Sequence, residues 1–215
     1  MLVNSALAED YPLDLSSVAN MGFKDDVARD GKGGWSDQGS GDDMRDFDIS
    51  RKDYEGVKFQ IVNPDKNVGK AVVTFNSPQA QTGLKTVTLD LSKQNIQARF
   101  LYLLHTSCWN QHSVGTVEGW VEVVFDDGSK LSRNIRSGIE VSDWYNPSSN
   151  ENSLVVFKKK SGNVEKGIFL TKLDFYKRER NTITSVTFTT TEKSVWILAG
   201  ASFSNVDVDL NEQKL

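Results

Sequence analysis

Apolar and polar residues alternate along much of the chain from residue 57 onward, with the two-residue period that is typical of half-buried β-strands. The segment 57–62 is the first clear case, and the segment 86–91 repeats the pattern. The segment 99–105 is more continuously apolar, which predicts a central strand buried on both faces. By the same criteria we expect further strands over 71–75, 118–125, 129–135, 168–176, 183–190 and 195–203.

Turn signals separate these segments, and no long helical pattern interrupts them. Asp127-Gly128 lies between two alternating runs and predicts a tight hairpin, because glycine accepts the positive φ angle of such a turn. Residues 18–28 hold at most one or two helical turns, and 25–53 and 144–162 have the polar composition of loops. About ten strands with long loops predict an all-β fold, a β-sandwich of the jelly-roll type. A mixed α+β fold is the alternative.

Nothing in the composition divides the 215 residues, so a single domain is expected. Residues 13–204 are predicted to form it, with 1–12 as an N-terminal extension and 205–215 as a tail or a linker to a following domain. A domain of this length buries a sufficient core without disulfide bonds. This agrees with the presence of a single cysteine, Cys108.

The net charge of the chain and its distribution limit the classes of partner that we expect. The 25 Lys and Arg residues against 29 Asp and Glu residues give a net charge of −4, and both signs are spread along the sequence. A nucleic-acid-binding protein would concentrate basic residues on one face, so we expect no such partner. No segment approaches the roughly 18 apolar residues of a membrane span. The polar sequence after Met1 does not resemble a signal peptide, so we expect a mature N-terminus or a piece of a longer secreted protein. We also expect a monomer.

The sequence contains no evident catalytic set. His105, Cys108 and His112 lie close together in the chain, as a metal site or an activated nucleophile would require, but a zinc site needs more ligands at defined spacing. Structural or binding roles are therefore favoured for this group. The Gly-x-Ser-x-Gly, phosphate-loop and dinucleotide-binding motifs are absent. We expect a protein that is not an enzyme, although its many acidic residues leave a glycosidase-like carboxylate pair open.

The segment 25–39 combines aspartates with flexible glycines, so that carboxylate and backbone oxygens can converge on a hard cation. Calcium takes such oxygen ligands and tolerates irregular geometry, and we predict a structural calcium ion held by Asp25, Asp30 and Asp37. The spacing and the terminal glutamate of an EF-hand are missing. The alternative is a polar loop whose glycines only form turns.

The five tryptophans are the second feature of the sequence that indicates a binding site. Trp120 and Trp196 lie inside strand patterns, so we expect both to pack in the core. Trp35, Trp109 and the Trp144-Tyr145 pair lie in or beside loops. There, flat rings can stack on sugar rings while neighbouring polar groups bind the sugar hydroxyls. Alternatively, these rings cap the core of the sandwich at the strand ends. The candidate carbohydrate-binding residues are His105, Trp109, Asp143, Trp144, Tyr145 and Trp35.

Several segments resemble, in the same order, a module of bacterial multidomain polysaccharide-degrading proteins. The opening similarity covers 14–20, 22–23 and 30–39, the last reading Asp-Gly-Lys-Gly-Gly-Trp-Ser-Asp-Gln-Gly. A Leu-His-Thr-x-x-Trp segment follows at 104–109, and an Asp-Trp-Tyr-Asn-Pro segment at 143–147. The remaining similar segments are 56–61, 127–128, 183–186 and 195–201.

The resemblance implies a galactose-binding-domain-like jelly roll, similar to the carbohydrate-binding modules of glycoside hydrolases and polysaccharide lyases. It also implies a structural calcium ion near one end of the sandwich, which fits the loop 25–43. Tyr145 stands where the family often has tryptophan. The chain is more lysine-rich than the family at 158–160, where a basic strip either attracts an acidic polysaccharide or protects a strand edge from aggregation.

The expected function is therefore that of a non-catalytic carbohydrate-binding module in a secreted bacterial polysaccharide-degrading enzyme, free or at the cell surface. Such a module keeps its fused catalytic domain near the polysaccharide and raises the effective concentration. One alternative is a structural jelly roll that packs against a catalytic domain without a ligand of its own. Another is a lyase or a glycoside hydrolase built on a β-sandwich.

Overall fold

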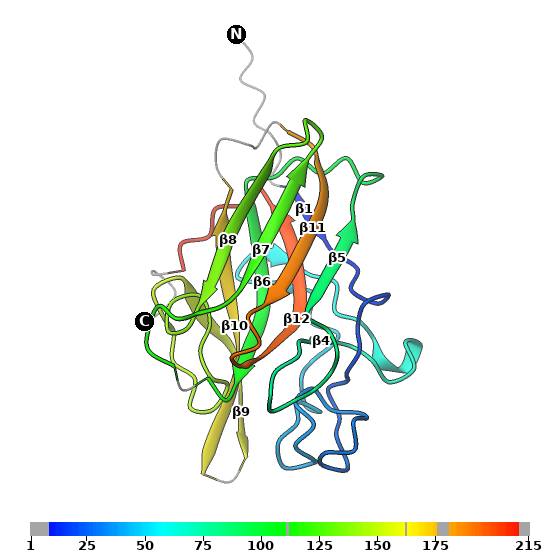
Figure 1. Cartoon of the computed structure of the whole chain (residues 1–215), viewed down its shortest axis with the longest axis vertical. Coiled ribbons are helices and arrows are strands. Elements are labelled where there is room, and N and C mark those ends of the chain that lie inside the picture. Colours follow the sequence, from blue (N-terminus) through cyan, green and yellow to red (C-terminus); the bar gives the residue numbers. More distant parts are fainter. Residues whose placement is uncertain (1–8, 111, 162, 176–180, 211–215) are drawn as a thin grey trace.

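The computed structural model describes residues 9–110, 112–161, 163–175 and 181–210, and within them the chain is nearly all-β, with antiparallel sheets (Figure 1). The larger sheet has the order β1 (Asp10–Pro12), β12 (Val195–Ser204), β6 (Phe100–Cys108), β10 (Val164–Asp174) and β9 (Ser153–Ser161), and β4 (Val73–Thr74) also pairs with β12. The second sheet has the order β5 (Thr86–Asp90), β11 (Ile183–Thr190), β7 (Val117–Phe125) and β8 (Lys130–Arg136). A two-stranded sheet of β2 (Asp53–Tyr54) and β3 (Val57–Lys58) and a 3-10 helix, η1 (Pro64–Lys66), complete the elements.

The predicted all-β class is confirmed, and most strands lie where the alternation placed them. All nine residues of β6 are buried, as its continuously apolar sequence predicts for a central strand. By contrast, β5 alternates exposed and buried residues along its length. The hairpin predicted at Asp127-Gly128 joins β7 to β8, and Gly128 has a φ of 77°. Residue 176, at the end of one predicted strand, lies outside the described residues.

The predictions differ from the structure at three strands. The segment 57–62 pairs only over β3, and 71–75 only over β4. The strand β9 lies inside the segment 144–162, which we expected to be a loop. Its apolar run at 154–157 was the available signal, but the surrounding asparagines, serines and lysines obscured it.

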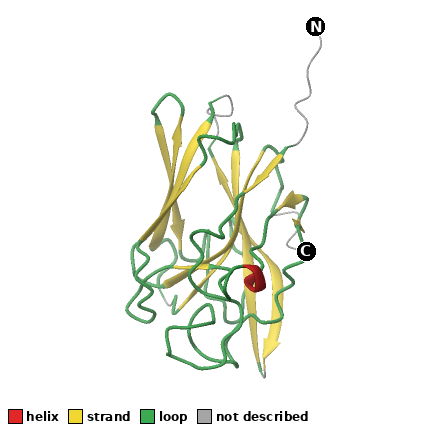
Figure 2. Cartoon of the chain, turned by 90° about the vertical axis from the view of Figure 1, so that its right-hand side faces the viewer, coloured by secondary structure: helices red, strands yellow, loops and turns green. Residues whose placement is uncertain are grey.

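The two main sheets pack face to face, and Figure 2 shows them from the side as separate layers of strands. Phe188 of β11 contacts Trp196 of β12 across this interface, with ring centroids 6.2 Å apart. Both side chains are fully buried. The prediction that Trp196 lies in the core is therefore confirmed.

A second apolar layer lies between the larger sheet and the segment before β5. A Cβ atom added to Gly200 of β12 would lie 3.2 Å from Phe59 and 3.3 Å from Ile61, so these side chains rest directly on the strand. Their alternation reflects packing onto a sheet face rather than pairing in a sheet. A chain of ring contacts extends this layer through Tyr54, Phe47, Phe23, Trp35 and Trp144.

The folded unit extends past both boundaries expected from the sequence. Strand β1 lies within the expected extension 1–12, and it pairs with β12. After residue 204, Val208 and Leu210 are buried, and the backbone N–H of Val208 donates to the Tyr102 hydroxyl at 3.0 Å. Residues 1–8 and 211–215, the outer parts of the expected extension and tail, lie outside the described residues.

Within the described part of the chain, no helix has the length and apolar character needed to cross a bilayer.

The expectation that Trp120 packs in the core is wrong, because 36% of this residue is exposed to solvent. It lies on β7 in the smaller sheet, and its side chain falls on the face that no other layer covers.

Candidate functional site

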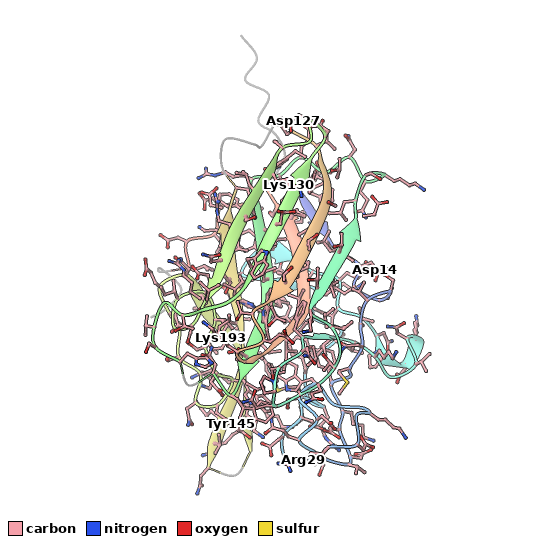
Figure 3. The ribbon with its side chains drawn as sticks, viewed as in Figure 1. Asp14, Arg29, Asp127, Lys130, Tyr145 and Lys193 are labelled. Atoms are coloured by element: carbon pink, nitrogen blue, oxygen red, sulfur yellow. The ribbon has the colours of Figure 1, made fainter. Side chains whose placement is uncertain are left out.

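Three loops meet at the end of the sandwich opposite the β7–β8 hairpin. They are the segment 24–46, the segment that follows β6 and the segment between β8 and β9. Figure 3 shows Arg29 and Tyr145 at this end and Asp127 of the hairpin at the other. We refer to this region as the loop end. Most of the residues singled out in the sequence lie here or in the core directly beneath.

Asp143 fastens two of these loops together. Its carboxylate accepts hydrogen bonds from the backbone N–H of Asn110 and of Tyr145, each at 2.9 Å. Burial raises the pKa of Asp143 above its ordinary value, and these backbone hydrogen bonds oppose that shift only in part. Both oxygens are thus occupied in positioning the chain beside Trp109 and Tyr145. We assign Asp143 a positioning role at this site.

Trp109 lies at the edge of a polar cleft. The residue is partly exposed and has a φ of 57°, a left-handed backbone conformation that is uncommon outside glycine. The cleft has a volume of about 700 Å³. Its polar lining is contributed by Arg29, Asp37, Gln38, Asp42, Gln79 and Gln81. One aromatic side chain among several hydrogen-bonding groups is a suitable lining for a sugar.

Tyr145 borders a second hollow of about 490 Å³, whose lining includes Asn146 and Lys166. Asp42 lines both hollows, so the two share one wall. The structure therefore brings together two of the predicted aromatic residues, Trp109 and Tyr145, on either side of Asp42. Both rings are partly exposed.

A buried lysine organises this shared wall. The Lys166 side chain is only 2% exposed, and its ammonium group lies 2.7 Å from Asp42 Oδ1. It also donates to the carbonyl oxygen of Gly41 and lies 4.9 Å from the centre of the Trp144 ring. The Tyr145 hydroxyl donates to the same Asp42 oxygen. A charged side chain this deeply buried requires such partners.

The pKa values of the wall follow from these contacts. Burial alone would raise the pKa of Asp42, but hydrogen bonds from Lys166 and Tyr145 outweigh it and hold the pKa below its ordinary value. Burial and the Asp42 carboxylate together raise the pKa of Tyr145. At neutral pH the wall therefore holds a carboxylate at Asp42 and a neutral phenol at Tyr145. A tyrosine in this state is a hydrogen-bonding and stacking group rather than a base.

Three of the predicted carbohydrate-binding residues are buried. Trp35 and Trp144 are at most 1% exposed and contact each other edge to face, with ring centroids 5.4 Å apart. Neither indole N–H has a hydrogen-bond partner within the described residues. No face of either ring is open to a ligand, so both cap the core, which was the alternative considered for them.

His105 is the third buried residue. Its Nδ1 accepts a hydrogen bond from the indole N–H of Trp196 at 3.0 Å, so the proton of the neutral ring is on Nε2. Nε2 donates to the Thr171 hydroxyl at 2.8 Å, which in turn donates to the carbonyl of Glu140 at 2.6 Å. This network ties three strands of the larger sheet, β6, β10 and β12, to the loop after β8 and gives His105 a structural role.

We expect His105 to make the protein less stable in mild acid. Burial lowers the pKa of His105 from 6.5 to about 3. Unfolding therefore takes up a proton between these values, and the stabilisation present above pH 6.5 is lost as the pH falls. The free energy of unfolding should fall by up to about 1.4 kcal/mol per pH unit in this range.

Urea unfolding at pH values from about 7 to 5 measures this slope. The comparison is with His105→Gln, which we expect to be less stable but to have a shallower pH dependence. Carboxylates with lowered pKa values, among them Asp42 and Asp43, titrate below this window, and Asp143, whose pKa is raised, is present in both proteins. Equal slopes in the two proteins would contradict the prediction.

The other residues near His105 in the sequence form no metal or nucleophile site with it. Cys108 is three positions further along β6, so its side chain points to the opposite face of the sheet. It is buried, and burial raises its thiol pKa. His112 is exposed and lies 3.3 Å from the carbonyl oxygen of Lys193. The preference for structural over catalytic roles is consistent with these placements.

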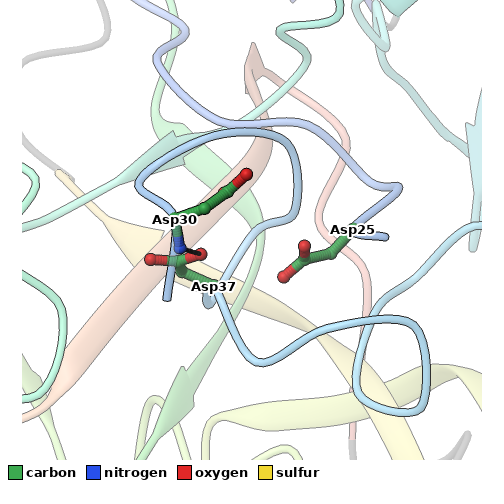
Figure 4. Close-up of side chains that lie close together, drawn as sticks. All are labelled: Asp25, Asp30 and Asp37. Atoms are coloured by element: carbon green, nitrogen blue, oxygen red, sulfur yellow. Dashed lines mark hydrogen bonds between the residues drawn. The ribbon is translucent and has the colours of Figure 1, made fainter. Parts of the chain in front are cut away.

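The structure brings together the three aspartates predicted to bind calcium. One carboxylate oxygen from each of Asp25, Asp30 and Asp37 lies within 4.8 Å of the others. Figure 4 shows Asp25 facing the turn that contains Asp30 and Asp37. Asp25 is buried, and it accepts backbone hydrogen bonds from Val27 at 3.1 Å and Gly39 at 2.7 Å.

The loop around Asp25 leaves room for its carboxylate only because of a glycine. A Cβ atom at Gly34 would lie 2.0 Å from the Cβ of Asp25. Asp37 accepts backbone hydrogen bonds from Asp30 at 3.2 Å and Gly31 at 3.1 Å. These bonds leave further lone pairs on the oxygens, so the cluster fits a calcium ion that completes its usual six to eight ligands with other oxygens.

The basic strip at 158–160 is largely paired in the structure. Lys159 lies 2.8 Å from Asp46 and 3.7 Å from buried Asp43. Lys158 lies 3.3 Å from Glu165 on the neighbouring strand. This pairing favours the interpretation of a charged strand edge over that of a binding site for an acidic polymer.

The sequence analysis missed Asp42, Lys166 and the glutamines of the Trp109 cleft. Lys166 lies in a strand, where no local pattern distinguishes a buried lysine from an exposed one. Asp42 belongs to an acidic loop in which every aspartate is a plausible solvated residue. Only the fold brings these side chains to Tyr145 and Trp109.

Neither the scan against models of protein families nor the search of curated proteins found a match to the chain.

Proposed function

We propose that this chain is a non-catalytic carbohydrate-binding module with a galactose-binding-domain-like jelly roll, and that the loop end is its binding site. The observation that supports this proposal most directly is a pair of partly exposed aromatic residues, Trp109 and Tyr145. They lie on either side of Asp42 in adjoining polar hollows. The rings supply apolar faces for the C–H surfaces of sugars. The amides and carboxylates around them supply hydrogen bonds to hydroxyl groups.

The rigidity of this region supports the proposal. Asp143 fixes the backbone beside both aromatic residues, and the Lys166–Asp42–Tyr145 network fixes the wall between them. A site held in place before binding loses less conformational entropy when the ligand binds. Sugar hydroxyls must still be desolvated, so we expect weak binding that becomes useful when the module is fused to a catalytic domain.

The setting that fits this activity is a secreted or cell-surface bacterial enzyme that degrades a polysaccharide. The module acts as a monomer and holds the enzyme near its polymer. We further propose that Asp25, Asp30 and Asp37 bind a structural calcium ion next to the cleft, since Asp37 belongs both to the acidic cluster and to the cleft lining.

Affinity electrophoresis through gels that contain neutral or acidic polysaccharides tests the binding proposal, with Trp109→Ala as the decisive variant. We expect the wild-type protein to be retarded by at least one polymer and the variant to lose about tenfold in affinity, as the loss of one stacked ring would produce. Tyr145→Phe retains the ring and is expected to bind more strongly than Tyr145→Ala. Retention that is identical in wild type and Trp109→Ala would reject the loop end as the site.

Removal of calcium should lower the melting temperature of the protein. Calcium at 100 times its dissociation constant would stabilise the fold by about 2.7 kcal/mol, and addition of EDTA would remove this stabilisation. Asp37→Asn should abolish the response to calcium, whereas Asp65→Asn, at an exposed turn far along the chain, should retain it. Identical melting curves with calcium and with EDTA would argue against the ion.

A structural domain without a ligand is the second candidate. The observation in its favour is the burial of His105, Trp35 and Trp144, which leaves fewer exposed aromatic residues than the sequence led us to expect. Such a domain would not be retarded by any polysaccharide. It would instead lose its association with the neighbouring catalytic domain when Trp109 or Tyr145 is replaced.

A further inference from the structure

An exposed tryptophan occupies the middle of a strand on the outer face of the smaller sheet. Trp120 is 36% exposed, whereas the other large apolar residues with high exposure in the described part of the chain are valines outside the strands. The face to which it belongs is turned toward the viewer in Figure 1 and consists of β8, β7, β11 and β5. No other part of the described chain packs against it as a third layer.

The strand register places Trp120 in an ordered polar surface. Side chains that share this face form rows across the four strands, about 4.8 Å from one strand to the next. The three rows are Asn134–Trp120–Thr189–Thr86, Ser132–Glu122–Thr187–Thr88 and Lys130–Val124–Ser185–Asp90. The neighbours of Trp120 in its own row, Asn134 and Thr189, are therefore polar, and so is Glu122 two residues further along the strand.

The threonines beside Trp120 are held in place by each other. Thr88 and Thr187 are hydrogen-bonded at 2.9 Å, and Thr86 donates to Thr189 at 3.3 Å. A hydroxyl has one donor and two acceptor positions, so each bonded pair retains one donor and three acceptor positions that face solvent. Both kinds of group are therefore available at fixed positions to a ligand rich in hydroxyls.

The charge of the face favours an uncharged ligand. Glu122 and Lys130 form an ion pair at 2.9 Å and compensate each other. Asp90 is the remaining charged residue of the rows, and it lies two strands and two rows away from Trp120. An anionic polymer would find no unpaired basic residue within these rows.

We propose that this outer face binds a neutral polysaccharide chain, with Trp120 stacked against one sugar ring and the threonine pairs bonded to hydroxyls of neighbouring sugars. A protein partner is disfavoured because the core of a protein interface is apolar, and here a single ring is surrounded by polar side chains. The surface is distinct from the loop end, since none of its residues lines either hollow there. The inference therefore does not depend on the loop-end site.

The test uses the same gels, containing cellulose derivatives, xylan, mannan or β-1,3-glucan as neutral polymers and polygalacturonate as the acidic one. We expect Trp120→Ala to reduce affinity for at least one neutral polymer by about tenfold, and Trp120→Tyr to retain most of it. Thr187→Val, which removes one hydroxyl at constant size, should also weaken binding. The melting temperature of each variant should fall by only a few degrees, because Trp120 is partly exposed and Thr187 loses one hydrogen bond to Thr88 at the surface.

This experiment can reject the sheet-face site and the loop-end site independently of each other. Wild-type affinity in Trp120→Ala for every polymer that the protein binds would overturn the sheet-face site, whatever the result for Trp109→Ala. Loss of affinity in Trp120→Ala with none in Trp109→Ala would support the sheet face and reject the loop end. A wild-type protein that no polymer retards would overturn both, and preference for polygalacturonate that depends on Trp120 would overturn the neutral ligand.

Discussion

Replacement of Trp144 by alanine should lower the free energy of unfolding by about 3–5 kcal/mol, the usual range when a large buried aromatic side chain is truncated. The Trp144 ring is fully buried and contacts Trp35, Tyr145 and the Lys166 ammonium group. Its removal leaves a cavity between the N-terminal segment and β10. The backbone hydrogen bond from Gly167 to the Trp144 carbonyl, at 2.9 Å, opposes collapse of the chain into this cavity.

Thermal and urea unfolding measure this effect, and a fall in melting temperature on the order of 10 °C is expected for a chain of this length. The control is Trp120→Ala, which removes the same side chain from a partly exposed position and should lower the melting temperature much less than Trp144→Ala. If Trp144→Ala were as stable as the wild type and had lost only sugar binding, Trp144 would be a ligand contact rather than part of the core. The sequence placed it in that role, and the burial of the ring argues against it.

Replacement of Lys166 by alanine should destabilise the protein by about 3 kcal/mol, the lower part of the range for breaking a buried ion pair. The variant leaves the Asp42 carboxylate without its ammonium partner and the Gly41 carbonyl without a donor. The effect falls at the lower end because 34% of the Asp42 side chain is exposed, so water can solvate part of the abandoned charge.

Equilibrium unfolding of a short series separates the causes of this loss. Lys166→Met keeps most of the side-chain volume, so its difference from Lys166→Ala reports packing, and a double-mutant cycle with Asp42→Asn reports the coupling between the charges. Lys158→Ala is the matched control, since this lysine lies on the adjacent strand in an exposed ion pair with Glu165 and should contribute little. Equal effects of Lys158→Ala and Lys166→Ala would show that the Asp42 network adds nothing to stability.

Both variants bear on the loop end as well. Lys166 and Trp144 touch the wall that Asp42 and Tyr145 form, and neither lines the Trp109 cleft. A loss of sugar binding in Trp144→Ala would therefore be an indirect consequence of a disordered wall, whereas Lys166→Ala also removes a group that lines the Tyr145 hollow. Trp109→Ala, whose ring is partly exposed, is the variant that tests direct contact.

Much of the candidate site could be found in the sequence, but not the role of each member. The segment 25–39 identified the three aspartates that the fold brings together, because carboxylates and glycines close in sequence converge through local turns. Asp143 and Tyr145 were identified because they flank Trp144 in the sequence. Asp143, however, accepts hydrogen bonds from backbone N–H groups instead of facing a ligand. Lys166 and Asp42 are 124 residues apart, and no local pattern relates residues at that separation.

The sequence by itself determined the all-β class and the place of most strands, because alternation has a local cause: successive side chains of a strand point to opposite faces. It also determined the Asp127-Gly128 hairpin, which depends on the φ angle of one glycine. It did not determine which tryptophans face water. Trp120 follows the same strand pattern as Trp196, but only the latter lies beneath a second sheet, while Trp35 and Trp144 lie in loops and are buried because the N-terminal segment covers the outer face of the larger sheet. Exposure depends on which layer packs on which face, and that depends on contacts between residues far apart in the chain, which only the tertiary structure decides.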